Sequence, residues 1–180
     1  MSAAKDIEYR FRLQGNYAGY ASGEIWKEIF GTITMLRSSK TEWTDSDGNK
    51  HTIDYGAQTF TRTIEVYDIA IDGVSLSSFG KNMVHEFGHA FNAVTVVETD
   101  MDPYSALGVD IGTEGVLPLR NYVRDGMPPY PDQQSPHQTT NEELYADMFL
   151  NWTYQSFLNN SQGTLEKTWM NSQMSTWAAR

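Results

Sequence analysis

The strongest constraint on this chain is a pair of histidines four residues apart in a segment with helical periodicity. Residues 78–93 read SFGKNMVHEFGHAFNA and contain the run His85-Glu86-Phe87-Gly88-His89. Side chains four apart lie about one turn apart on one helix face, so both imidazoles can reach one metal ion. Glu86 points beside that ion, where a carboxylate can take a proton from a metal-activated water. The alternative is a structural histidine pair on an amphipathic helix.

A catalytic zinc ion uses three protein ligands and leaves a fourth position open. The chain has no cysteine and four histidines, so the third ligand must be His, Asp or Glu. The extended pattern with a third histidine is absent, because Asn92 and Thr95 follow the motif. On a second predicted helix, residues 140–158, Glu143 and Asp147 are four residues apart. One of them can ligate the metal, and the other can accept a hydrogen bond from a ligand histidine.

These two patterns together resemble the gluzincin, or thermolysin-like, zinc metallopeptidases. That class has H-E-x-x-H on one helix and a Glu ligand on a later helix, with an Asp four residues after the Glu. The resemblance covers the two motif helices. It implies one catalytic Zn²⁺ bound by His85, His89 and Glu143. It also implies that Glu86 is the general base and that Asp147 orients a ligand histidine.

The sequence departs from that class at one point. The class often has Asn directly before the ligand Glu, whereas here Asn141 precedes Glu142. The four-residue spacing to Asp147 selects Glu143 instead, because the Asp must share the ligand's helix face to reach a histidine.

The reaction also needs a donor for the oxyanion that forms when water attacks a peptide carbonyl. In the class that the motifs resemble, a Tyr or His often has this role. We select His137, which lies six residues before Glu143, and keep Tyr122, Tyr130 and Tyr145 as alternatives. An exposed loop histidine is the other interpretation of His137.

Gly88, inside the motif, costs a helix about 1 kcal/mol relative to Ala. Close approach of another backbone or of substrate would explain it, and a tolerated, neutral glycine is the alternative.

Other segments predict the remaining architecture. Apolar and polar residues alternate in 7–13, which favours a strand. Apolar residues at helical spacing after a candidate N-cap at Ser22 favour a backing helix at 22–37. The Asp45-Ser46-Asp47-Gly48-Asn49 turn predicts a hairpin of 41–44 and 51–55, since Asp-Gly suits a tight turn. The turn also resembles the start of a calcium loop, but Gly56 stands where such a loop has Glu. We further expect a strand at 60–71, a largely irregular stretch at 94–140 and a helix at 164–177.

These elements predict an α+β fold in a single zincin-like catalytic domain, residues 1–180. A small twisted mixed sheet, the backing helix and the active-site helix form an N-terminal lobe, residues 1–93. The C-terminal lobe, residues 94–180, is mainly helical or irregular and carries the Glu143 helix. Residues 60–71 are expected to be the edge strand that lines the cleft, where an extended peptide can pair.

Composition narrows the classes of partner. The formal net charge is −10 and the pI is about 4.7, which disfavours nucleic acid and anionic membranes. No apolar run approaches the roughly 18 residues of a membrane span. We expect a monomer that acts on a protein or peptide, and we favour a mature secreted chain over a cytoplasmic one. An acidic cluster of Glu98, Asp100, Asp102, Asp110 and Glu114 could bind Ca²⁺, but its spacing defines no site.

The sequence therefore predicts a zinc-dependent endopeptidase. Two alternatives stay open: a zinc-binding module without activity, and a zinc hydrolase of a non-protein amide such as peptidoglycan.

Overall fold

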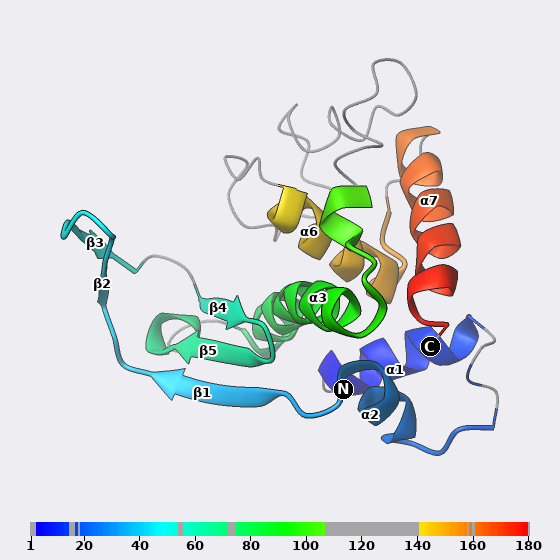
Figure 1. Ribbon diagram of the computed structural model, residues 1–180, viewed down its shortest axis with the longest axis horizontal. Coiled ribbons are helices and arrows are strands. Elements are labelled where there is room, and N and C mark those ends of the chain that lie inside the picture. Colours follow the sequence, from blue (N-terminus) through cyan, green and yellow to red (C-terminus); the bar gives the residue numbers. More distant parts are fainter. Residues whose placement is uncertain are drawn as a thin grey trace.

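The computed structural model describes residues 3–14, 17, 19–53, 56–71, 75–106, 141–157, 159 and 161–179. This part of the chain is a mixed α+β structure, in which helices pack together beside a small mixed sheet (Figure 1). The expected fold class is confirmed at this level. No helix in the described ranges is long and apolar enough to cross a membrane.

Helix α3 (Leu76–Thr99) lies at the centre of the structure (Figure 1). It contacts α1 (Ala3–Leu13), α2 (Glu24–Phe30) and α6 (Asn141–Tyr154). Val84, Phe87 and Phe91 recur at helical spacing and are buried, which explains why this segment forms a core helix. A last helix, α7 (Ser161–Trp177), contacts α6. The helices predicted at 78–93, 140–158 and 164–177 are thus confirmed, with shifted ends.

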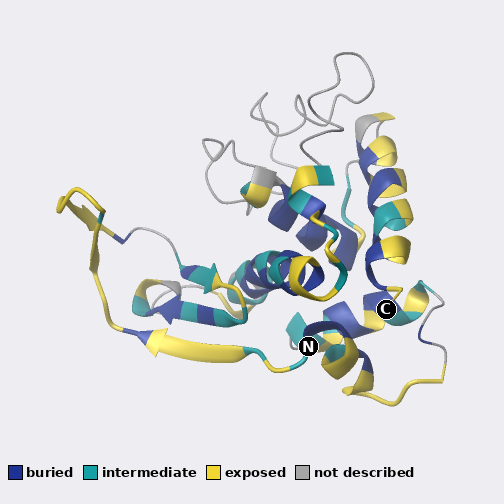
Figure 2. Ribbon diagram, viewed as in Figure 1, coloured by how far each residue is buried: buried dark blue, intermediate teal, exposed yellow. Residues whose placement is uncertain are grey.

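A cluster of aromatic rings holds α1, α3 and α6 together. The ring of Phe11 lies 5.7 Å from Phe91, 6.4 Å from Phe149 and 4.9 Å from Trp152, between centroids. Such pairs contribute about 0.5–1.5 kcal/mol each beyond their buried area. Figure 2 shows buried residues on all three helices. α3 and α6 are therefore fixed against each other by the core itself.

The mixed sheet has the strand order β1-β5-β4. β1 (Thr34–Ser38) runs parallel to β5 (Thr63–Tyr67), and β4 (Ala57–Phe60) runs antiparallel to β5. Ile64 and Val66 of β5 belong to the same buried core as the α3 side chains. β4 contacts α3 and pairs with one strand only among the described residues.

The predicted hairpin is confirmed as β2 (Glu42–Thr44) and β3 (Lys50–Thr52), which extend away from the body of the molecule (Figure 1). The carboxylate of Asp45 accepts hydrogen bonds from the main-chain N–H groups of Asp47 (3.0 Å) and Asn49 (2.8 Å). Gly48 has a φ of 87°, which a glycine adopts without strain. These contacts explain the turn without a bound ion.

The strand predicted at 7–13 is wrong, because these residues belong to α1. The sequence IEYRFRL fits both a period of two and a helical period. Ile7 and Phe11, four residues apart, are both fully buried, so burial of one helix face decided the outcome.

The single helix predicted at 22–37 is also wrong. α2 ends before Gly31, which has a φ of 62°, and β1 follows. Gly23, with a φ of 88°, is the N-cap in place of Ser22. Ile25 and Ile29 face the core as expected, but Leu36 lies on a strand and is exposed.

The strand predicted at 60–71 divides into three parts. Phe60 ends β4, a turn with Thr61 at a φ of 54° follows, and a 3₁₀ turn, η1 (Asp68–Ala70), comes after β5. β5 is the middle strand, so it is not the edge strand that we expected at this position. β4 has that role. The stretch predicted to be irregular is helical up to Thr99 and again at 103–106, and residues 107–140 lie outside the described part.

Candidate metal centre

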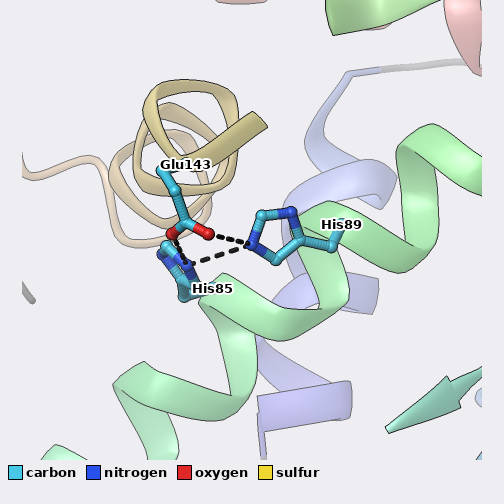
Figure 3. A group of neighbouring side chains, drawn as sticks. All are labelled: His85, His89 and Glu143. Carbon is cyan, nitrogen blue, oxygen red and sulfur yellow. Dashed lines mark hydrogen bonds and ion pairs between the residues drawn. The ribbon is translucent and has the colours of Figure 1, made fainter. Parts of the chain in front are cut away.

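Helix α3 places the two motif histidines as their spacing predicts. Their rings lie edge to face with centroids 4.9 Å apart, and the two Nε2 atoms are 3.2 Å apart. His85 is buried, whereas His89 is partly accessible. Both Nε2 atoms therefore converge on one point beside the helix (Figure 3).

Helix α6 brings Glu143 to the same point. Its Oε2 lies 3.1 Å from Nε2 of His85, and its Oε1 lies 3.6 Å from Nε2 of His89 (Figure 3). Ligand atoms of these three residues all lie within 4.8 Å of one another. Glu142, the alternative, is exposed to solvent. The structure thus brings Glu143, and not Glu142, to the histidines.

The spacing of these atoms can be compared with that of a zinc site. Two ligand atoms bound at 2.0–2.1 Å with a tetrahedral angle lie about 3.3–3.4 Å apart. The observed separations of 3.1, 3.2 and 3.6 Å bracket this value. The three residues therefore fit three of the four positions around a tetrahedral zinc ion, and no fourth ligand is found among the described residues. Within the described part of the chain, no other His, Asp and Glu side chains form such a group.

Gly88 allows the two helices to approach this closely. A Cβ at this position would lie 2.9 Å from Cα and 3.3 Å from the carbonyl oxygen of Ala146, and 3.1 Å from Cβ of Phe149. Both residues are on α6. Close approach of another backbone is thus the reason for this glycine, and the interpretation as a neutral glycine is wrong.

Asp147 lies where the spacing argument expects it. Its Oδ1 is 2.8 Å from Nδ1 of His85, so the imidazole N–H donates to the carboxylate. The pKa of His85 is raised to about 10: burial disfavours the imidazolium, but hydrogen bonds to Asp147 and then to Glu143 outweigh that effect. Burial likewise opposes ionisation of Glu143, yet hydrogen bonds from His85 and His89 lower its pKa far below the ordinary value. The carboxylates around the two histidines therefore stabilise positive charge at this site.

Two residues that form hydrogen bonds with the motif were not predicted from the sequence. The hydroxyl of Thr59 on β4 donates to Oε2 of Glu86 at 2.6 Å, with the Glu86 main-chain oxygen at 3.2 Å. The hydroxyl oxygen of Tyr104 lies 2.7 Å from Nδ1 of His89. Both partners lie far from the motif in sequence and on other elements, so no local spacing could have indicated them.

Only one of the four residues that we named as candidate oxyanion donors lies in the described part of the chain. His137, Tyr122 and Tyr130 lie outside the described part of the chain. Tyr145 is fully buried, with its hydroxyl 3.9 Å from Sδ of Met174, so it cannot meet a substrate.

Two residues of the acidic cluster, Glu98 at the end of α3 and Asp102 after it, are engaged in other contacts. Glu98 forms an ion pair with Arg62, and Asp102 accepts hydrogen bonds from the main-chain N–H of Tyr104 and the hydroxyl of Ser105. Asp110 and Glu114 lie outside the described ranges. The described acidic residues here form no group of converging carboxylates that could hold a cation.

Comparison of the chain with known protein families, with curated proteins and with solved structures found no match. The site must therefore be interpreted from its own geometry.

Proposed function

We propose that this protein is a zinc-dependent endopeptidase with a zincin-like catalytic domain. The observation that supports the proposal most is the convergence of His85, His89 and Glu143 at tetrahedral spacing, with Glu86 next to them in sequence. Among the described residues three ligands converge, which leaves a position for water, whereas structural zinc sites are closed by four. This count of described ligands favours catalysis over a zinc-binding module without activity.

Zinc, when bound, would supply Lewis acidity and would lower the pKa of a water molecule toward neutrality. Glu86 would accept the proton of the attacking water and deliver it to the leaving amine. The hydroxyl of Thr59 donates to Oε2 of Glu86, and this contact restricts the orientation of the carboxylate. Asp147 keeps His85 in the tautomer whose Nε2 faces the ligand cluster.

The position of β4 favours an extended peptide as substrate. Its residue Thr59 contacts Glu86 directly, so β4, an edge strand of the sheet in the described part of the chain, lies next to the proposed base. A peptide backbone can add to such an edge through main-chain hydrogen bonds. A substrate aligned there would bring its carbonyl groups past Glu86.

The test compares Glu86→Gln with wild type after both are loaded with zinc, using a diverse peptide mixture and mass spectrometry. We expect cuts by wild type and a loss in turnover of about 10²–10⁴-fold in the variant, since the general base is lost. Zinc content should be equal, because Glu86 is no ligand. Glu142→Gln is the matched control, since that carboxylate is exposed and should leave both zinc and turnover unchanged.

Equal turnover by Glu86→Gln and wild type would contradict the mechanism. No cuts by wild type at full zinc occupancy would contradict the peptidase assignment. Release of fragments from purified cell wall, but not from peptides, would support the amide hydrolase instead.

A further inference from the structure

The nitrogen of His89 that faces away from the ligand cluster has a defined partner. Nε2 of His89 faces His85 and Glu143, whereas Nδ1 lies 2.7 Å from the hydroxyl oxygen of Tyr104. The two rings meet edge to face, with centroids 6.2 Å apart. If Nε2 binds a metal, Nδ1 must carry the proton, and the phenol oxygen is then its acceptor.

We infer that Tyr104 is a positioning residue for the metal centre: it accepts the Nδ1–H of His89 and thereby fixes the tautomer and ring orientation that present Nε2 to the metal. This inference rests on the proposed zinc site. It gives His89 the kind of support that Asp147 gives His85, from a residue that neither motif contains.

Tyr104 is itself held by contacts on two sides. Its main-chain N–H donates to Oδ1 of Asn92 at 3.1 Å and to Oδ1 of Asp102 at 3.0 Å. Asn92 is buried on α3, close to one turn after His89. The ring of Tyr104 lies edge to face with that of Tyr145 on α6, with centroids 5.5 Å apart. Tyr104 is thus anchored to both helices that carry the ligands.

The chemical difference between the two acceptors affects the charge of the site. His85 donates to a carboxylate, whereas His89 donates to a phenol. A phenol is neutral near pH 7, whereas a carboxylate is charged. The phenol orients a ligand without adding another negative charge next to Glu86, Glu143 and Asp147. A metal ion there keeps more of its positive charge available to polarise a substrate.

The first test measures Zn²⁺ affinity by competition with a chelator. Loss of an outer partner of a ligand histidine weakens metal binding by roughly 10–100-fold, which is the effect we expect for Tyr104→Phe. Tyr145→Phe is the matched control. It removes the hydroxyl of a neighbouring buried tyrosine, which lies 3.9 Å from Sδ of Met174. We expect its Zn²⁺ affinity to equal that of wild type.

The second test separates positioning from packing. In zinc-loaded protein with ¹⁵N-labelled histidine, NMR should show His85 and His89 bound through Nε2, each with an Nδ1–H that exchanges slowly with water. Tyr104→Phe should speed exchange at His89 while exchange at His85 stays slow. His85 is therefore the internal control for folding. Loss of packing alone would leave the ratio of the two exchange rates unchanged.

The outcomes distinguish the two proposals. If wild type binds no Zn²⁺, the proposed zinc centre and function fail. If wild type binds Zn²⁺ and Tyr104→Phe keeps the same affinity and the same exchange rate at His89, the role of Tyr104 is refuted and the zinc site stands. If Tyr104→Phe does not fold, the NMR spectrum of zinc-loaded wild type still tests the inference. Metal bound through Nδ1 of His89, or fast Nδ1–H exchange there, contradicts the inference.

Discussion

Replacing Gly88 by alanine tests whether the metal centre depends on the close approach of α3 and α6. In an isolated helix this change would stabilise by about 1 kcal/mol, because Gly has a lower helix propensity than Ala. Here the new Cβ would lie 2.9 Å from Cα of Ala146, which is 0.5 Å short of the 3.4 Å where ordinary contact begins. That atom belongs to the backbone, so relief requires a movement of α6 as a whole.

The size of the effect follows from these distances. Overpacking a core costs about 1–3 kcal/mol, so after the gain in propensity we expect Gly88→Ala to destabilise the metal-free protein by about 0–2 kcal/mol. The effect on the metal should be larger. Ala146 lies between Glu143 and Asp147 on α6, and a shift of half an ångström exceeds the roughly 0.2 Å tolerance of metal–ligand distances. We therefore expect Zn²⁺ affinity to fall at least tenfold.

The assays are urea unfolding of the metal-free protein and chelator competition for Zn²⁺. Gly80→Ala is a matched control on the same helix, because a Cβ there meets nothing within 4 Å. It should stabilise by up to about 1 kcal/mol and leave Zn²⁺ affinity unchanged. If Gly88→Ala stabilises as much as Gly80→Ala and binds Zn²⁺ as tightly as wild type, the close approach does not control the site and the reasoning is refuted.

Two more changes probe the base and the core. Thr59→Val removes the hydroxyl that donates to Oε2 of Glu86. A hydrogen bond to a charged group contributes about 1.5–3 kcal/mol, so turnover should fall about 10–100-fold while Zn²⁺ affinity stays unchanged. Thr59→Ser keeps the hydroxyl and should restore turnover; a Val variant as active as wild type would exclude this role. Glu166 on α7 is fully buried, its carboxylate oxygens have no hydrogen-bond partner among the described residues, and burial raises its pKa from 4.5 to about 9. The folded state then keeps a proton that the unfolded state loses, so between pH 4.5 and about 9 stability should fall by up to about 1.4 kcal/mol per pH unit. Unfolding of Glu166→Gln across this range should show a smaller fall, and equal slopes in both proteins would disprove the burial argument.

The part of the site that the sequence predicted consists of side chains related by helical spacing. His85 and His89 lie on one face of α3 because they are four residues apart, and the same rule relates Glu143 to Asp147 on α6. Spacing also selected Glu143 over Glu142, and Glu143 is the residue that α6 brings to the two histidines. A local rule sufficed for these residues, because each pair lies within one regular helix.

Contacts between elements could not be predicted in this way. Thr59 reaches Glu86 from β4, and Tyr104 reaches His89 from the segment that follows α3. Both contacts depend on how the chain folds back, which no spacing within a helix encodes. The strand predicted at 7–13 failed for a related reason: its pattern fits two periods, and only the aromatic rings of α3 and α6 select the helical one.

The charge at the α3–α6 interface links metal binding to folding. Burial lowers the pKa of His85, but hydrogen bonds to Asp147 and Glu143 outweigh that effect and raise the pKa to about 10. The metal-free site therefore keeps a proton on His85 near neutral pH. A zinc ion between the Nε2 atoms would displace that proton and take over its role as the buried cation. Because these ligands meet only when α3 and α6 are in contact at Gly88, zinc would bind the folded chain and stabilise it by mass action. Substitutions that separate the two helices should therefore weaken metal binding and folding together, whereas substitutions of Glu86 or Thr59 should lower turnover and leave metal binding unchanged.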